Sequence, residues 1–198
     1  LTNPTGTALT ITLSNGAVIN IAANASTGSV TVAAPSDDAV IDAGSVSVTV
    51  ASTSGGNYEQ LTVGTGSAGN PVITTVTDDA DSTTLSLTAS ASVVEGGNIT
   101  YTASVTNPTG TALVVTLSNG SSITIPAGQS SGNVSVAAPS DDVYIDAGSV
   151  TVSVTGTSGG NYENLQNGSI SATTAITDDS DSTTLNLTGT ASVVEGGS

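Results

Sequence analysis

Apolar and polar residues alternate along most of the chain in short runs. Residues 98–105 read NITYTASV and residues 149–155 read SVTVSVT, so that every second side chain is apolar. A period of two places one face of a β-strand on a core and the other face in water. Helical periodicity is absent from the chain. The pattern therefore predicts an all-β protein with no helix.

Turn-forming segments separate these runs, among them EGG at residues 95–97 and NG at residues 119–120. An NG pair flanked by alternating apolar residues is a strong signal for a hairpin. Seven strands within about 100 residues are typical of an antiparallel β-sandwich. The seven runs are 83–94, 98–105, 112–118, 121–127, 132–138, 149–155 and 169–177.

The chain repeats itself once. TNPTGTAL at residues 2–9 recurs 104 residues later, whereas DSTTL at residues 81–85 recurs 100 residues later. The spacing shortens because segment 62–76 is four residues longer than its counterpart 166–176, so we expect a surface loop in the longer segment. A period near 100 residues corresponds to one small domain per repeat.

The repeat is out of register with the ends of the sequence. Residues 1–81 are expected to form a partial sandwich that lacks its first two strands, and residues 82–181 a complete sandwich. Residues 182–198 repeat only the opening strand of a third sandwich. We therefore expect the chain to be one part of a longer tandem array.

Charge excludes several classes of partner. The chain has 16 acidic residues and no lysine, arginine or histidine, which gives a formal charge of −16. Nucleic acids and anionic membranes are bound through lysine and arginine, so neither is an expected partner. No apolar run approaches the roughly 20 residues that span a bilayer, so we expect no insertion into a membrane.

Catalysis is not expected either. Without histidine, cysteine or lysine, the chain has almost nothing with which to activate a nucleophile. Paired carboxylates can cleave glycosides, but four tyrosines are the only aromatic residues available as a platform for sugar. Tyr58 and Tyr162, both in the repeated sequence GGNYE, are expected to pack at a corner of their sandwiches.

Every acidic residue has a counterpart in the other copy of the repeat. If each strand crosses the sandwich once, the loops after the first, fifth and seventh runs lie at the same end of the complete repeat. Those loops carry Glu95, Asp141, Asp142, Asp146, Asp178 and Asp179. Glu163 falls at the opposite end, where we expect it to face the acidic end of the preceding repeat with Asp37, Asp38, Asp42, Asp78, Asp79 and the linker residue Asp81.

So many carboxylates in a small volume raise one another's pKa and oppose folding. Because the chain has no basic side chain, a bound cation is the remaining way to balance them. Six to eight oxygen ligands from flexible loops suit Ca²⁺ better than Zn²⁺, copper or the stricter octahedron of Mg²⁺. The sequence therefore predicts Ca²⁺ sites at the end of each repeat and in the linker.

Three blocks of the second repeat are SVVEGGNITYTASVTNPTGTALVV, DDVYIDAGSVTVSVTGTSGGNYENL and TTAITDD. Together they resemble the extender repeats of giant type I-secreted, RTX-type bacterial adhesins, and more distantly the Calx-β domain. The resemblance covers essentially the whole chain. It implies immunoglobulin-like sandwiches with calcium at the domain ends, and ligand roles for the set Glu95, Asp141, Asp142, Asp178, Asp179, Asp181, Asp37, Asp38, Asp78, Asp79 and Asp81. For Asp42, Asp146, Glu59 and Glu163 it gives weaker support.

Three functions remain open at this point. The first is a stalk segment of a secreted adhesin at the bacterial cell surface, in which Ca²⁺ stiffens the array and neighbouring repeats are the partners. The second is a subunit of an extracellular fibre, in which residues 183–198 of one copy complete the open sandwich of another copy. The third is a carbohydrate-binding module, which the scarcity of aromatic residues disfavours.

Overall fold

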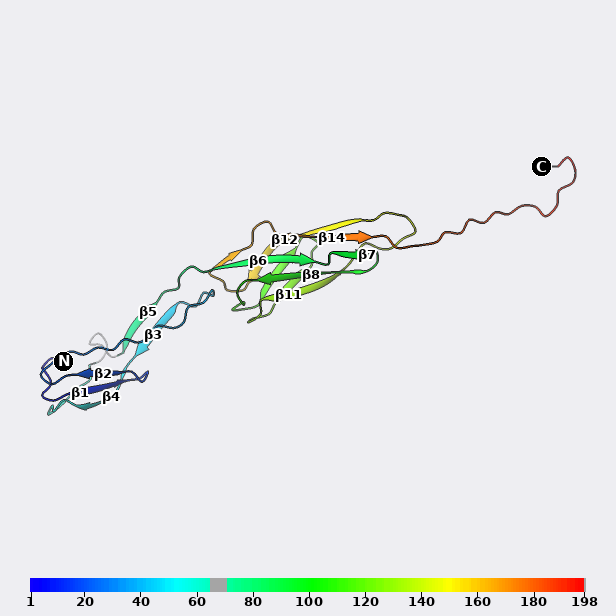
Figure 1. Ribbon diagram of the computed structural model, residues 1–198. Coiled ribbons are helices and arrows are strands. Elements are labelled where there is room, and N and C mark those ends of the chain that lie inside the picture. The colour runs from blue at the N-terminus through cyan, green and yellow to red at the C-terminus, as the bar shows by residue number, and fades with distance from the viewer. Residues whose placement is uncertain (65–70, 198) are drawn as a thin grey trace. The chain divides into compact units, whose positions relative to one another are not determined.

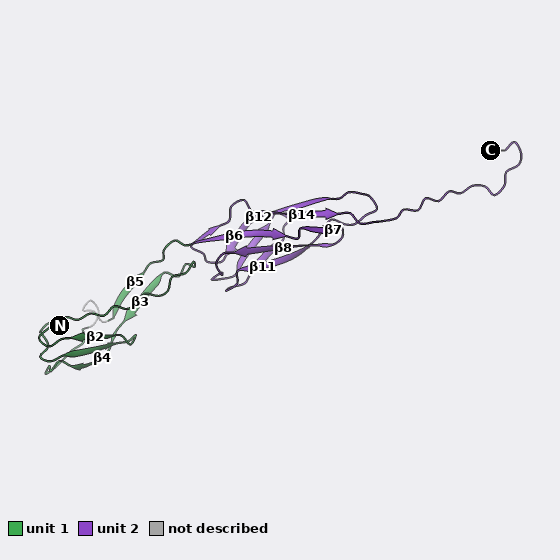
Figure 2. Ribbon diagram, in the orientation of Figure 1, with its two compact units in different colours: residues 1–81 green, residues 82–198 purple. Residues whose placement is uncertain are grey.

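The computed structural model describes residues 1–64 and 71–197, and these residues form strands and loops without any helix (Figure 1). No segment among them is therefore a helix long and apolar enough to cross a membrane. The chain divides into two compact units, unit 1 at Leu1–Asp81 and unit 2 at Ser82–Ser198 (Figure 2). The all-β prediction is confirmed. The surface loop expected within 62–76 falls partly on residues 65–70, outside the described residues.

Unit 2 is a sandwich of two sheets. One sheet has the strand order β10-β9-β12-β14-β7 and the other has the order β11-β8-β6-β13. The strands are β6 (Ser82–Ala89), β7 (Ser92–Val94), β8 (Asn98–Val105), β9 (Leu113–Leu117), β10 (Ser122–Ile125), β11 (Ser131–Ala137), β12 (Gly148–Gly159), β13 (Asn164–Gln166) and β14 (Ser171–Thr177).

The core of unit 2 lies between these two sheets. Along β8, residues Ile99, Tyr101 and Ala103 are buried while the residues between them are at least partly exposed. Leu113 and Val115 of β9 meet them from the other sheet. The alternation that predicts the strands therefore also selects the side chains that fill the sandwich.

The first predicted run, 83–94, forms two strands instead of one. β6 pairs antiparallel with β8, whereas β7 pairs parallel with β14 in the opposite sheet. The transition falls between Ser90, whose N–H donates to Thr100, and Ala91, whose carbonyl accepts from Ala175. A second short parallel pair joins β13 to β6, so residues 82–197 form nine strands where the runs predict seven.

The described residues of unit 1 form counterparts of only one of these sheets. Its strands are β1 (Leu9–Leu13), β2 (Val18–Ile21), β3 (Gly44–Val48), β4 (Val50–Gly55) and β5 (Val72–Val76). They pair in the orders β2-β1-β4 and β3-β5, matching β10-β9-β12 and β12-β14 of unit 2. Among the described residues of unit 1, no strand corresponds to the second sheet.

The tyrosine of each GGNYE sequence packs at a corner, as predicted. The hydroxyl of Tyr162 donates to the carbonyl of Asn107 at 2.8 Å, and the hydroxyl of Tyr58 donates to the carbonyl of Asn3 at 2.8 Å. Tyr162 is buried. The two units thus repeat the same local structure down to single hydrogen bonds.

Candidate metal centre

The EGG turn directly after β7 is tied to two other segments by backbone hydrogen bonds. The Glu95 N–H donates to the carbonyl of Thr177 at 3.1 Å, which lies just before Asp178. The Gly96 N–H donates to the carbonyl of Pro139 at 2.7 Å, and Pro139 begins the acidic loop 139–147. Three segments far apart in the sequence therefore meet at this turn, and each of them carries carboxylates.

Glycine is needed at both positions of the turn. Gly96 has a φ of +68°, and a Cβ there would lie 3.4 Å from the Cβ of Asp141. A Cβ on Gly97 would lie 2.8 Å from Cγ1 of Val93 and 2.9 Å from the carbonyl oxygen of Val94. The turn is thus compact enough to bring Glu95 against the acidic loop only because these two residues lack side chains.

Glu95, Asp146 and Asp178 form an inner cluster. Each offers a carboxylate oxygen within 4.8 Å of the other two. Glu95 is only 8% exposed, and its Oε2 atom is buried without a hydrogen-bond partner among the described residues. Asp178 is half-buried and Asp146 is exposed. A buried carboxylate oxygen without a donor is uncommon, and it marks the place where a ligand would complete the site.

The surroundings of Glu95 raise its pKa to about 7. The largest cause is a hydrogen bond with the Asp146 side chain, followed by burial and by the negative charges of Asp146, Asp178 and Asp142. A hydrogen bond between two carboxyl groups needs a proton on one of them. With no cation bound, we therefore expect Glu95 and Asp146 to share a proton.

Asp141, Asp179 and Asp181 form an outer cluster in the same unit. Their carboxylate oxygens also lie within 4.8 Å of one another, but all three residues are exposed. Partial desolvation, then the charges of Asp179 and Asp181, raises the pKa of Asp141. Since Asp179 and Asp181 follow β14, this cluster joins the acidic loop to the segment that leaves the sandwich.

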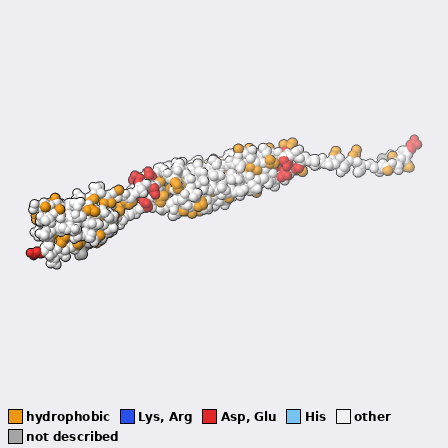
Figure 3. Space-filling model, turned by 60° about the horizontal axis from the view of Figure 1, so that its bottom comes forward, with side chains coloured by type: hydrophobic (Ala, Val, Ile, Leu, Met, Phe, Trp, Pro, Cys, Tyr) orange, Lys and Arg blue, Asp and Glu red, His pale blue; other side chains and the backbone are white. Residues whose placement is uncertain are grey.

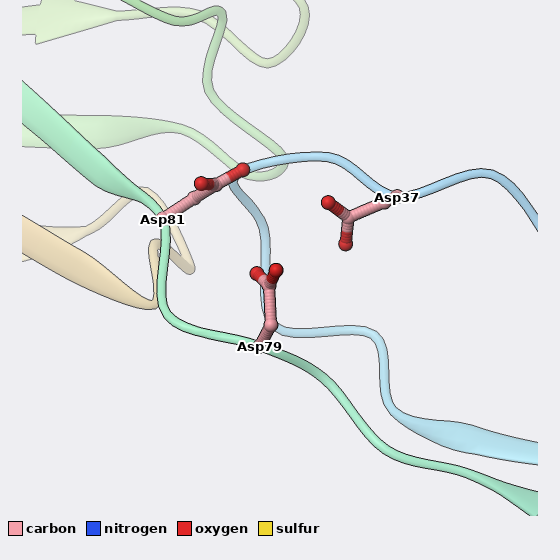
Figure 4. A group of neighbouring side chains, drawn as sticks. All are labelled: Asp37, Asp79 and Asp81. Carbon is pink, nitrogen blue, oxygen red and sulfur yellow. The ribbon is translucent and has the colours of Figure 1, made fainter.

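Unit 1 has the same outer cluster at Asp37, Asp79 and Asp81. Figure 4 shows Asp37 on the loop and the other two on the segment after β5, with their carboxylates turned toward one another. The charge of Asp79 is the largest cause that raises the pKa of Asp37, ahead of desolvation and the charge of Asp81. The cluster thus belongs to the repeat and not to one copy of it.

The remaining predicted ligands lie outside these three clusters. Asp38 and Asp142 each accept a hydrogen bond at 2.8 Å from the backbone two residues on, in Val40 and Tyr144, and so shape the acidic loop. Asp42 and Asp78 are in contact, since the Asp42 N–H donates to Oδ2 of Asp78 at 3.3 Å.

Glu163 lies apart from the clusters of unit 2. It precedes Asn164, which pairs with Ser82 at the start of β6, whereas the inner and outer clusters follow the end of β14. Strand parity predicts this end of the sandwich for Glu163. That Glu163 faces the preceding repeat stays a prediction. Figure 3 shows the acidic side chains gathered in a few compact patches. On the face shown, no acidic side chain is visible along the middle of unit 2.

A family model for the LapA domain matches residues 1–79 and again residues 81–179. The chain belongs to the LapA domain family. LapA domains are adhesin-type domains, which gives the chain an adhesin-related function in biofilms and places it among proteins of the cell surface. This agrees with the adhesin part of the resemblance seen in the sequence. No curated protein matches the chain.

The outer cluster lies at the C-terminal end of each LapA match, with Asp81 and Asp181 just beyond the ends of the two matches, and the second match also contains the inner cluster. The donors are carboxylate oxygens alone, and no basic side chain exists anywhere in the chain to neutralise them. Together with the orphaned Oε2 of Glu95, this donor set fits a hard divalent cation and does not fit a soft metal.

Proposed function

We propose that this pair of LapA domains is a stalk segment of a cell-surface adhesin in which bound Ca²⁺ stiffens each domain end and linker. The observation that carries the proposal is the buried carboxyl group of Glu95, which lies against Asp146 and Asp178 and leaves one oxygen unpaired. A buried carboxyl group stays ionised only beside a compensating positive charge, and the chain supplies no basic side chain.

Ca²⁺ is the cation that suits these ligands best. It accepts six to eight oxygen ligands in irregular geometry, which loops can supply together with backbone carbonyls and water. Extracellular calcium modules typically bind with dissociation constants of about 10⁻⁴ to 10⁻³ M, which matches the calcium concentration outside cells. Mg²⁺ demands a stricter octahedron and gives up its water reluctantly.

The positions of the clusters explain how binding would stiffen the segment. In unit 2 the inner cluster joins the EGG turn, the acidic loop and the end of β14. The outer cluster adds Asp181, and its equivalent in unit 1 adds Asp81, each in the segment that follows the last strand. A cation held by loop and linker together restricts the linker's backbone, so consecutive domains would keep a defined direction and project a distal binding module.

Calcium would also distinguish the loosened state in which the chain is exported from the stiffened state in which it functions outside the cell. Where Ca²⁺ is scarce, repulsion between the carboxylates loosens the domain ends. Outside the cell, binding stabilises the folded state by mass action. Neighbouring repeats of the same chain are the partners in this proposal.

Thermal unfolding with and without calcium tests the proposal. At 5 mM Ca²⁺ and a dissociation constant of about 10⁻⁴ M, one site contributes about 2.3 kcal/mol. In a domain of this size each kcal/mol raises Tm by roughly 4–8 °C. We expect Tm in 5 mM Ca²⁺ to exceed Tm in excess chelator by more than about 10 °C, with a smaller rise in Mg²⁺. An equal Tm in calcium and in chelator would contradict the proposal.

A further inference from the structure

Three Asn-Gly pairs occur in the chain, and they begin at Asn15, Asn119 and Asn167. Serine follows the second and the third pair, so Asn119 and Asn167 share the local sequence Asn-Gly-Ser. All three asparagines are exposed. Neither the local sequence nor exposure distinguishes Asn119 from Asn167, so a difference in their chemistry must come from the fold.

An asparagine followed by glycine can lose its side-chain amide without an enzyme. The glycine nitrogen attacks Cγ of the asparagine, a new N–Cγ bond forms and the Cγ–Nδ2 bond breaks, and Nδ2 leaves as ammonia with the proton of the glycine nitrogen. Water then opens the succinimide ring at one of its two carbonyl carbons, which gives aspartate or isoaspartate. Glycine favours the attack because it has no Cβ to obstruct it. The reaction needs a glycine N–H that can lose its proton and a carboxamide that can turn toward it.

The turn between β9 and β10 holds both reacting groups of the Asn119 pair. The Gly120 N–H donates to the carbonyl of Leu117 at 3.0 Å. Oδ1 of Asn119 accepts hydrogen bonds from the N–H of Ser121 at 3.1 Å and from its Oγ at 2.7 Å. Gly120 has a φ of +83°, which suits glycine at this place in the turn. The glycine nitrogen and the carboxamide are both engaged, so the turn must open before they can react.

Unit 1 has the same turn at Asn15, between β1 and β2. The Gly16 N–H donates to the carbonyl of Leu13 at 2.9 Å. Oδ1 of Asn15 accepts a hydrogen bond from the N–H of Ala17 at 3.1 Å. Gly16 also has a φ of +83°. The engagement of both groups is therefore a property of this hairpin in each unit.

Asn167 lies in a different setting, between β13 and β14, where residues 167–170 form no strand. Among the described residues, none accepts a hydrogen bond from the Gly168 N–H. The Asn167 side chain uses Nδ2, which donates to Oγ1 of Thr157 at 3.2 Å. Within the same described part of the chain, Oδ1 of Asn167 accepts no hydrogen bond. The glycine nitrogen and the carbonyl side of the carboxamide are thus available to each other without breaking a turn.

We propose that Asn167 is a site of spontaneous modification in the folded chain, at which the side-chain amide becomes a carboxylate or an isoaspartyl linkage, whereas turns protect Asn15 and Asn119. Water is the co-reactant and ammonia is released. The modification adds one negative charge to the formal charge of −16. An isoaspartyl linkage also adds a methylene group to the main chain, at residues that belong to no strand. Both clusters of unit 2 contain a residue that follows β14, whereas Asn167 precedes this strand, so the proposal does not depend on bound calcium.

Ageing of the folded full chain at slightly alkaline pH tests the proposal. Two hydrogen bonds of ordinary net strength slow a reaction that must break both of them roughly thirtyfold, so Asn167 should react at least about tenfold faster than Asn119. A glutamate-specific protease cuts after Glu59, Glu95 and Glu163 and so places the three Asn-Gly pairs on separate peptides. Mass spectrometry of these peptides measures the replacement of NH₂ by OH at each asparagine. Equal rates at Asn119 and Asn167, or a faster reaction at Asn119, overturn the proposal.

The same chain unfolded in urea is the matched control. Asn119 and Asn167 keep their common sequence there, but the turn at Asn119 no longer exists. The two rates should become similar, because Asn119 reacts faster than in the folded chain and Asn167 changes little. If Asn167 exceeds Asn119 by the same factor in urea, the neighbouring sequence and not the fold is the cause, and the proposal fails. It also fails if Asn167 reacts in urea but stays intact in the folded chain.

Gly168→Ala removes the reactive pair and leaves the fold intact, because a Cβ at this position meets nothing within 4 Å. The added Cβ obstructs the attack on Asn167, so this variant should lose most of the more acidic species that ion-exchange chromatography separates from the aged parent chain. Acidic species that form at the parent's rate would place the modification at another residue and overturn the assignment. The order of the rates should be the same in calcium and in chelator, so the result is independent of the calcium proposal.

Discussion

A carboxyl group buried among other carboxyl groups is stable when it shares a proton or a cation, and Glu95 is in this situation. Its side chain is 8% exposed, and hydrogen bonding to Asp146, burial and neighbouring charges raise its pKa to about 7. We therefore expect the site to exchange its proton for a cation at little cost near neutral pH. Asp142 in the acidic loop of the same unit is exposed and lacks this burial.

Replacing Glu95 by glutamine should weaken calcium binding while leaving the apo protein at least as stable. The amide removes one negative charge from the cluster, so repulsion falls in chelator and Tm should not decrease. Changes to groups that merely support metal ligands cost about tenfold to a hundredfold in affinity, and loss of a ligand should cost no less. Calorimetric titration with Ca²⁺ measures the affinity.

Glu195→Gln is the control for that substitution. It changes the same EGG motif, but Glu195 is exposed and lies outside the three carboxylate clusters. This variant should bind calcium like the parent chain. Equal affinity in the Glu95 and Glu195 variants would show that the inner cluster is not a calcium site.

The stability of the apo protein should depend on pH with a definite sign. The folded state raises the pKa of Glu95 to about 7, whereas the ordinary pKa of a glutamate side chain is 4.5. Glu95 therefore keeps its proton in the folded state up to about pH 7. Its contribution to stability is therefore present at low pH and is lost as pH rises through about 7. The raised pKa values of Asp37 and Asp141 act in the same direction.

Urea unfolding in chelator at pH 5 and pH 8 measures this dependence. We expect a lower midpoint at pH 8 than at pH 5, and calcium should restore the midpoint at pH 8 because it replaces the lost proton. A midpoint in chelator that is unchanged or higher at pH 8 would rule out a protonated inner cluster.

At the scale of elements, the EGG turn determines whether the carboxylates meet. Gly97→Ala places a Cβ 2.8 Å from Val93 and 2.9 Å from the backbone oxygen of Val94, so the turn must shift. Overpacking of this kind typically costs about 1–3 kcal/mol. The substitution should lower both Tm and calcium affinity. Gly168→Ala, where a Cβ meets nothing within 4 Å, is the control and should change Tm little.

The sequence predicts those strands whose alternation is local. Residues 98–105 and 149–155 are recognisable because each residue's environment follows from its parity in the strand. The division of run 83–94 into β6 and β7 is not visible in the sequence, because it depends on which strand each half meets across the sandwich. β13 escapes prediction for the same reason: its three residues pair only with β6.

The sequence likewise predicts the end of the repeat at which the candidate site lies, but not how its carboxylates divide into clusters. Strand parity brings Glu95, Asp146 and Asp178 to one end of the repeat, because loops after alternate strands share an end. Their separation from Asp141, Asp179 and Asp181 into an inner and an outer cluster could not be predicted. That separation depends on the burial of Glu95, which follows from hydrogen bonds between the EGG turn and two distant segments.

At the scale of the whole molecule, the distribution of charge and the repeat both support cation binding at the domain ends and linkers. All charges are negative, and the same outer cluster follows the last strand of both LapA domains. A solubilising charge would have no reason to return to the same loop and linker positions. An array of such domains would acquire a cation site at every linker, so its stiffness would respond to calcium along its full length.

Anomalous scattering from crystals grown in millimolar calcium tests the central claim most directly. We expect a peak at Glu95, Asp146 and Asp178, with oxygen ligands at about 2.3–2.6 Å, and a second peak at the outer cluster. Crystals in which the inner cluster holds no peak, with the Glu95 carboxyl still buried, would contradict calcium as the ion that balances this site.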